Sequence, residues 1–340
     1  MAGKGSEKIG EGGNIIVAKA PFRISFVGGG SDLPAFYEKS DGAVLSATID
    51  KYVYIITHPF FERDKIRLKY LQTETVKSVG EIRHPIIRAC MELLDPGKGI
   101  EIASLADIPA GTGMGSSSAF TVGLLQNLHA LKNEVIEKNA LAEMACKVEI
   151  DILGEPIGKQ DQYSSAYGGM NVFEFKKGGE VKATPINLKK ADFELLNENT
   201  LLFFTGETRS ASELLRRQSS GYEDKKKMDA QRKMVALVWE LKDALASSDL
   251  NEFGRLLGKN WELKKQLNNL TTTAIDCHYE RAVAAGALGG KLLGAGGGGF
   301  LLFYCEPEKQ QKVREALYGL YELSFRFDTE GSKIILSDRT

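Results

Sequence analysis

Residues 109–119 read Pro-Ala-Gly-Thr-Gly-Met-Gly-Ser-Ser-Ser-Ala and lie between a strand-like and a helix-like segment. Glycines alternate at Gly111, Gly113 and Gly115, and glycine permits positive φ and close approach of the backbone to a ligand. The serines lead into a predicted helix at 119–131, whose N-terminus would present unpaired N–H groups and the positive end of the helix dipole. A flexible loop with a serine cap would explain only some of these residues. The pattern therefore favours a phosphate-binding loop.

This loop differs from two common nucleotide-binding motifs. No Gly-Lys-Ser/Thr follows its glycines, so it is not a Walker A sequence. The segment Met114–Ser118 supplies glycine only at Gly115, so it is not a Gly-x-Gly-x-x-Gly fingerprint either. Its serine hydroxyls could also reach a hard metal ion such as Mg²⁺.

Strand-like and helix-like segments alternate on both sides of the loop. Short β-branched and aromatic runs between Gly, Pro, Ser or Asp predict strands, and helical spacing of apolar residues predicts helices. We expect an α/β or α+β fold from this interleaving. The predicted strands are 15–18, 24–27, 44–49, 52–57, 66–70, 100–104, 170–175, 201–205, 300–304, 324–327 and 333–336. The predicted helices are 82–94, 119–131, 138–153 and 307–320, with a helix-rich stretch at 210–267.

The length of the chain favours two domains. It has 340 residues, more than the roughly 250–300 at which a single core stops growing. The polar stretch Lys176–Lys190 suggests the boundary, which gives an N-terminal domain at 15–185 and a C-terminal domain at 186–340. Residues 1–14 are polar and are predicted to form a disordered tail.

Composition argues against several classes of protein. The net charge is −1, from 44 basic and 45 acidic residues, without the basic excess of a nucleic-acid binder. No segment approaches the roughly 18–20 apolar residues of a membrane span. Four cysteines, Cys90, Cys146, Cys277 and Cys305, form no Cys-x-x-Cys pair, which predicts buried reduced thiols in a cytoplasmic protein.

Two further segments carry candidate ligand-binding residues. The run Lys291-Leu-Leu-Gly-Ala-Gly-Gly-Gly-Gly-Phe300 has more glycines than a hairpin turn needs, which suggests backbone held close to a ligand. In the segment 20–32, Arg23 could polarise oxygen ligands and Asp32 could accept hydrogen bonds from sugar hydroxyls. A strand-end arginine and a turn aspartate are also common structural features.

Together these segments resemble the GHMP kinases, the superfamily of galacto-, homoserine, mevalonate and phosphomevalonate kinases. The segments 20–32, 109–119 and 291–299 appear in the family's order, and the resemblance spans about residues 15–336. Within the superfamily, segments 20–37, 158–163 and 208–212 look like the D-glycero-D-manno-heptose 7-phosphate kinases. Galactokinases carry Gly-Glu-His before a Thr-Asp, whereas this chain has Gly29-Gly30-Ser31 before Asp32. This difference argues against a galactokinase. Met114 replaces a common leucine and conserves its volume.

The resemblance implies an N-terminal α/β domain and a C-terminal ferredoxin-like domain, with the active site between them. By position, Asp161 would orient or deprotonate the attacking hydroxyl and Arg23 would stabilise developing negative charge. Ser117 and Glu149 would hold Mg²⁺. The ATP phosphates would be cradled by Pro109, Gly111, Gly113, Gly115, Ser116, Ser117 and Ser118. The sugar would be bound by Asp32, Gly29, Gly30, Gly296, Gly297 and Arg209.

The subgroup implies a sugar kinase that phosphorylates the anomeric hydroxyl of heptose 7-phosphate. The 1,7-bisphosphate product would feed nucleotide-activated heptose for surface polysaccharide such as lipopolysaccharide. The phosphate of this acceptor needs basic partners, and Lys159, Arg209 and Arg88 are candidates. The alternatives are another GHMP sugar kinase of the fucokinase or galactokinase type, or a catalytically silent sugar sensor. A silent homologue would be expected to lack Glu149 or Asp161, and this chain has both.

Overall fold

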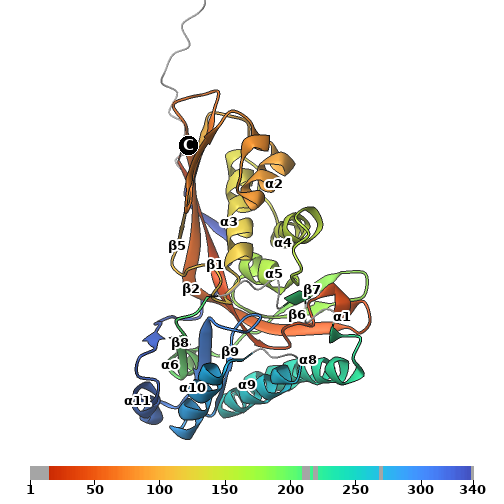
Figure 1. The fold of residues 1–340 in the computed structure, drawn as a ribbon, viewed down its shortest axis with the longest axis vertical. Helices are drawn as coiled ribbons and strands as arrows, with labels where there is room; N and C mark the ends of the chain where they lie inside the picture. Colours follow the sequence, from red (N-terminus) through yellow and green to blue (C-terminus); the bar gives the residue numbers. More distant parts are fainter. Residues whose placement is uncertain (1–14, 209–214, 217–220, 268–270, 338–340) are drawn as a thin grey trace, which may run out of the picture.

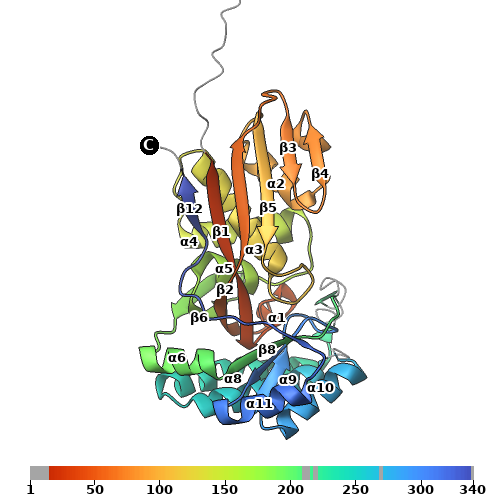
Figure 2. The same cartoon turned by 90° about the vertical axis from the view of Figure 1, so that its left-hand side faces the viewer.

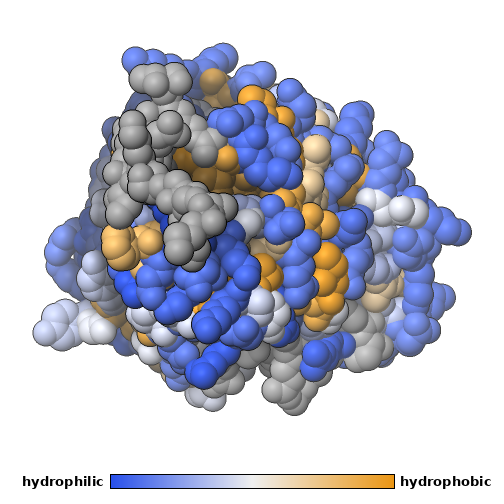
Figure 3. Space-filling view, turned by 90° about the horizontal axis from the view of Figure 1, so that it is seen from above, coloured by the Kyte–Doolittle hydropathy of each residue, from blue (hydrophilic) through white to orange (hydrophobic). Residues whose placement is uncertain are grey.

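The computed structural model describes residues 15–208, 215–216, 221–267 and 271–337. Two β-sheets, each covered by helices, make up this part of the chain (Figure 1). The predicted disordered tail at 1–14 lies outside the described residues. Among the described helices, none combines the length and apolar character needed to cross a bilayer. Seen from above, most of the surface is hydrophilic and the hydrophobic residues form separate patches (Figure 3).

The first sheet contains the N-terminal strands and also the last strand of the chain. Its strands are β1 (Ile16–Val27), β2 (Gly42–Pro59), β3 (Ile66–Lys69), β4 (Thr73–Val76), β5 (Ile100–Ala106), β6 (Met170–Phe175), β7 (Val181–Pro185) and β12 (Lys333–Ser337). They lie in the order β12-β1-β2-β5-β3-β4, and β2 also pairs with β6, which pairs with β7. All these pairs are antiparallel except β3 with β5.

Helices cover one face of this sheet. They are α2 (Pro85–Leu94), α3 (Ser116–Leu131), α4 (Lys138–Cys146) and α5 (Gln160–Tyr167), with the π-helix η2 (Lys147–Ile152) between the last two. Short helical turns, α1 (Pro34–Tyr37) and η1 (Val79–Glu81), lie in the loops. Figure 2, turned by 90° from Figure 1, shows the strands in front of these helices. The central helix α3 packs on β1 and β2, so the loop before it opens at one end of the sheet.

The second sheet has the order β11-β8-β10-β9 and is antiparallel throughout. Its strands are β8 (Thr200–Phe204), β9 (Gly289–Leu292), β10 (Phe300–Tyr304) and β11 (Tyr321–Glu322). The helix α6 (Lys190–Glu198) precedes β8; α8 (Lys225–Ala246), α9 (Leu250–Lys265) and α10 (Thr273–Ala284) lie between β8 and β9, and α11 (Pro307–Ala316) follows β10. Strand, helices, two strands, helix and strand in this order form a ferredoxin-like unit. The predicted fold class is therefore confirmed.

Several predicted elements differ from those observed. The runs predicted at 15–18 and 24–27 form the single strand β1, because Pro21 sits at a register shift that the strand passes through as a bulge. The runs predicted at 44–49 and 52–57 likewise form the single strand β2. Residues 324–327 form only an isolated bridge between Ile49 and Phe327. The polar strand β4 was not predicted. Cys277 is exposed, unlike the three other free cysteines, so the prediction that all four thiols are buried is wrong for it.

One apolar core joins the two sheets. Phe26 of β1 packs edge-on against Phe253 of α9, with ring centroids 5.0 Å apart, and against Phe327 at 5.7 Å. The predicted boundary between 185 and 186 falls directly after β7, and it stays a prediction. After the second sheet, the chain returns to the first sheet through β12, which pairs with β1. The C-terminal half is therefore connected to the first sheet at both its beginning and its end.

Candidate active site

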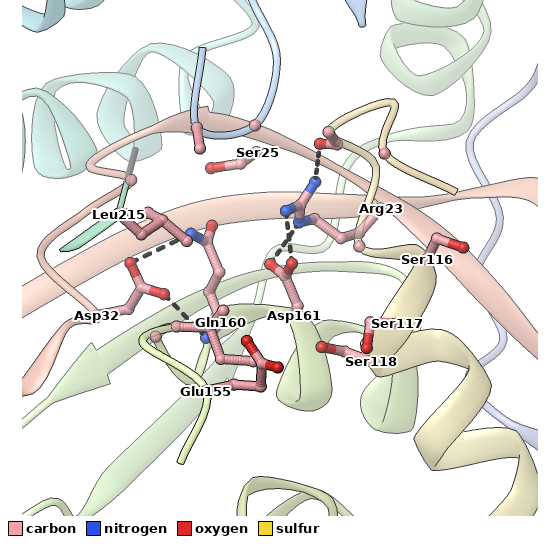
Figure 4. Close-up of a pocket in the computed structure, with 18 of the residues that line it drawn as sticks. Arg23, Ser25, Asp32, Ser116, Ser117, Ser118, Glu155, Gln160, Asp161 and Leu215 are labelled. Atoms are coloured by element: carbon pink, nitrogen blue, oxygen red, sulfur yellow. Dashed lines mark hydrogen bonds and ion pairs between the residues drawn. The ribbon is translucent and has the colours of Figure 1, made fainter. Parts of the chain in front are cut away.

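A cavity of about 480 Å³ lies where the two sheets meet (Figure 4). Its walls come from β1 and the glycine turn after it, the N-termini of α3 and α5, helix α9, strand β9 and the glycine run that follows β9. Segments far apart in sequence therefore supply one site. Most of the residues predicted from the motifs line it.

The loop before α3 adopts the conformation that its glycines predict. Gly111, Gly113 and Gly115 have φ angles of 78°, 80° and 78°, which side-chain-bearing residues rarely adopt. Gly115 is the N-cap of α3, which begins at Ser116 rather than at the predicted Ala119. All three glycines and the three serines line the cavity, whereas Pro109 does not. Free N–H groups and the positive helix end thus face a space suited to phosphate.

Arg23 and Asp161 form a two-pronged ion pair across this cavity (Figure 4). Arg23 Nε and Nη2 each donate to one carboxylate oxygen of Asp161 at 2.7 Å. Arg23 Nη1 donates to Gly113 O at 2.6 Å, which fixes the guanidinium against the glycine loop. Asp161 lies in the first turn of α5, where the helix dipole favours a negative charge.

Glu149 lies directly behind the serines of the loop. It is fully buried in the π-helix η2, an irregularity that often marks functional sites. It accepts hydrogen bonds from Ser117 Oγ at 2.6 Å and Gln162 Nε2 at 2.8 Å. Burial raises the pKa of Glu149, and the hydroxyls of Ser117 and Ser118 and the Gln162 amide oppose that shift.

The hydroxyl of Ser117 and the carboxylate of Glu149 are suited to holding Mg²⁺. Within the described ranges, no cluster of three or more His, Cys, Asp or Glu side chains could hold a metal ion. Mg²⁺ needs no such cluster, because it keeps several waters and is held by one or two carboxylates plus substrate phosphates. A hydroxyl and a buried carboxylate, Ser117 and Glu149, beside a phosphate loop match this requirement. A bound cation would also favour the charged form of Glu149.

Asp32 is held rigidly in a different part of the cavity. It accepts hydrogen bonds from Gly30 N at 2.9 Å and from Gln160 N and Nε2 at 3.2 Å each. Burial raises the pKa of Asp32, as does the nearby charge of Asp161, while the backbone N–H groups oppose the shift. Gly29 and Gly30 line the cavity beside it. Buried donors and acceptors held in this way are suited to binding hydroxyl groups.

The second glycine run packs against the first. A Cβ on Gly113 would lie 3.0 Å from Gly294 Cα, so the two loops touch through backbone. Gly294 and Ala295 line the cavity, whereas the predicted Gly296 and Gly297 do not. The predicted Arg209 lies outside the described residues. Lys159 turns away to donate to Gly179 O at 2.6 Å and lines a separate cavity, and Arg88 lines neither.

Other residues of the cavity were not predicted. Gln160 donates a hydrogen bond to Asp32 and positions it. Its place directly before Asp161 is the sequence signal that could have identified Gln160. His84 and Phe120 stack with ring centroids 5.2 Å apart at an apolar end of the cavity. Lys291 is separated from the glycine run by only two leucines, whereas no sequence signal marks Lys264. Both lysines line the cavity.

Comparison with known families agrees with this geometry. The model of the GHMP kinases N terminal domain matches residues 83–169, and that of the GHMP kinases C terminal matches residues 241–322. The first match contains the glycine-serine loop, Glu149 and Asp161. The chain belongs to the GHMP kinases. This GHMP kinase is accordingly a phosphotransferase whose acceptor is an alcohol group.

Relatives of this GHMP kinase match over nearly its whole length. A D-glycero-alpha-D-manno-heptose 7-phosphate kinase of Campylobacter jejuni is 28% identical and covers 94% of this chain and 98% of its own. A galactokinase of Pyrococcus furiosus is 25% identical, covering 91% of this chain and 94% of its own. The crystal structure of a D-glycero-D-manno-heptose 1-phosphate kinase from Bacteroides thetaiotaomicron superposes with a TM-score of 0.78 at 26% identity. It covers 94% of this chain and 99% of its own.

Proposed function

We propose that this enzyme transfers the γ-phosphoryl group of ATP to the anomeric hydroxyl of D-glycero-D-manno-heptose 7-phosphate, giving the 1,7-bisphosphate and ADP. The observation that carries the proposal is the Arg23–Asp161 pair, fixed to the phosphate loop through Gly113 and sharing one cavity with Asp32. The similarity to heptose phosphate kinases over most of the chain supports the choice of acceptor.

Each group of residues in the site has its own role in the proposed reaction. The N–H groups around Gly111–Gly115 and the N-terminus of α3 bind the ATP phosphates. Asp161 orients the attacking hydroxyl and accepts its proton as the oxygen–phosphorus bond forms and ADP leaves. Arg23, held between Asp161 and Gly113 O, stabilises the negative charge that spreads over the transferred group. Asp32, supported by Gln160, binds a sugar hydroxyl and sets the acceptor's orientation.

Ser117 and Glu149 are the residues that would hold Mg²⁺. When bound there, the ion would neutralise phosphate charge beside the loop. The apolar end of the cavity, lined by His84, Ile86 and Phe120, suits the adenine base. Burial lowers the pKa of His84, which keeps its ring neutral and suited to stacking. ATP would thus lie along the α3 side, with the acceptor on the Asp32 side.

The test is ADP release with MgATP across a panel of acceptors: heptose 7-phosphate, heptose, fucose, galactose and mevalonate. We expect the highest kcat/KM with heptose 7-phosphate. Preference for fucose or galactose would overturn the proposed acceptor and favour the fucokinase or galactokinase type. Binding of ATP without turnover of any acceptor on the panel would instead favour the sugar sensor.

A further inference from the structure

Two buried lysines face the cavity without a carboxylate partner. Lys264 of α9 and Lys291 of β9 are 6% and 2% exposed, and both line the cavity. Among the described residues, the hydrogen-bond partners of both ammonium groups are backbone carbonyls rather than carboxylates. Lysine is rarely buried unless it is paired, because desolvation of an unpaired charge is costly. The site therefore holds positive charge that its own side chains do not neutralise.

The lysines are held by backbone carbonyls, with donors left over. Lys264 Nζ donates to Gly294 O, and Lys291 Nζ donates to Ser25 O at 2.7 Å and Phe26 O at 2.8 Å. An ammonium group carries three N–H donors, so each lysine retains at least one for a ligand. Ser25 Oγ is buried, lines the same cavity and has no hydrogen-bond partner among the described residues. A third donor is thus available beside Lys291.

The balance of charges in the cavity favours a bound anion. The charge of Arg23 is already paired with Asp161, and burial raises the pKa of Asp32, which reduces its ability to balance the lysines. Burial, together with the charge of Arg23, lowers the pKa of Lys264 to about 8, although Asp32 acts in the opposite direction. Burial and the charges of Lys264 and Arg23 lower the pKa of Lys291. A phosphate dianion would offset these unfavourable interactions.

We propose that Lys264, Lys291 and Ser25 form the subsite that binds the phosphate already carried by the acceptor. This assignment rests on the proposed function. The transferred phosphate has its own partners in Arg23 and the α3 N-terminus. Ser25 Oγ instead lies beside the turn that carries Asp32, since a Cβ on Gly29 would be 3.2 Å from it. The subsite replaces the predicted Lys159 and Arg88, whose side chains do not reach this cavity.

The test compares kcat/KM for heptose 7-phosphate with kcat/KM for heptose, in the wild type and in Lys264→Met and Ser25→Ala. A hydrogen bond to a charged group gives about 10-fold or more in affinity, so we expect Lys264→Met to lower the ratio by about that factor. Ser25→Ala should lower it by a smaller factor. Lys265→Met is the matched control, because Lys265 neighbours Lys264 but pairs with Glu262 outside the cavity.

Three results would overturn the assignment. An unchanged ratio together with a raised KM for MgATP would show that the lysines bind the transferred phosphate. An unchanged ratio with a lower unfolding temperature in Lys264→Met would make Lys264 structural, whereas replacing an unpaired buried charge by methionine should preserve or raise that temperature. A wild type without preference for heptose 7-phosphate would overturn the proposed acceptor itself, and this result is visible before any variant is made.

Discussion

Asp161 is paired with Arg23, and the proposed function makes it the group that accepts the proton of the attacking hydroxyl. Replacing it by asparagine keeps the shape and removes the proton acceptor. We expect Asp161→Asn to lower kcat by about 10²-fold or more, a typical loss for a general base. The KM for MgATP should change little, since the phosphate loop and Glu149 are untouched. Steady-state kinetics with both substrates varied measures the two effects separately.

Asp151→Asn provides the matched control, because its exposed carboxylate lies nearby in the sequence but outside the catalytic cavity. It should keep the wild-type kcat. If Asp161→Asn turned over at nearly the wild-type rate, Asp161 would not be the proton acceptor.

The sequence motifs identified some residues of the site but not all of them. Arg23, Asp32 and Asp161 could be selected because each stands within a motif that the family resemblance covers. Lys264 could not, because it occurs in a helical stretch with Lys265 directly beside it, and only the folded packing buries Lys264 and leaves Lys265 partly exposed. Sequence shows which residues can carry charge, but desolvation of that charge depends on distant segments.

Among the elements, the N-terminus of α5 depends on a glycine contact with Asp32. A Cβ on Gly158 would lie 1.9 Å from Asp32 Oδ2 and 2.9 Å from Asp32 O, far inside van der Waals contact. Gly158→Ala should therefore displace Asp32 and raise the acceptor's KM by about 10-fold or more, the effect of losing a hydrogen bond to a charged group. Isothermal titration of the acceptor and steady-state kinetics measure this change.

Gly80→Ala is the control, since a Cβ added to Gly80 would meet no atom within 4 Å and its φ is not positive. It should leave the acceptor's KM at the wild-type value. An unchanged KM in Gly158→Ala as well would show that Asp32 does not contact the acceptor.

Local patterns predicted most elements but misjudged how they join. Strands β6 and β10 have the predicted bounds because glycine or turn residues flank them closely. Helix α3 starts early because Gly115, in a left-handed conformation, caps it and brings the serines into its first turn. The predicted helix 138–153 changes at Lys147 into a π-helix, which apolar spacing alone does not reveal. Sheet order also stayed beyond prediction, since pairing such as β12 with β1 is long-range.

In the molecule as a whole, residues that follow β8 hold the glycine turn that carries Asp32. Gln231 of α8 is fully buried, and its Nε2 donates to Gly28 O at 3.1 Å and Gly29 O at 3.4 Å. Tyr222 Oη contacts both Gln231 Oε1 at 2.9 Å and Gly30 O at 3.1 Å. The turn that positions Asp32 is thus fixed by the C-terminal half of the chain.

Gln231→Leu should loosen this turn without touching any substrate. Leaving buried carbonyls unsatisfied costs about 1–3 kcal/mol, so the unfolding temperature should fall by a few degrees. Because the turn also carries Asp32, the acceptor's KM should rise while the KM for MgATP stays close to wild type. Gln311→Leu, an exposed glutamine of α11, controls for the substitution itself. A lower unfolding temperature with both KM values unchanged would show that Gln231 supports the fold alone, and that the two halves of the molecule do not cooperate in binding the acceptor.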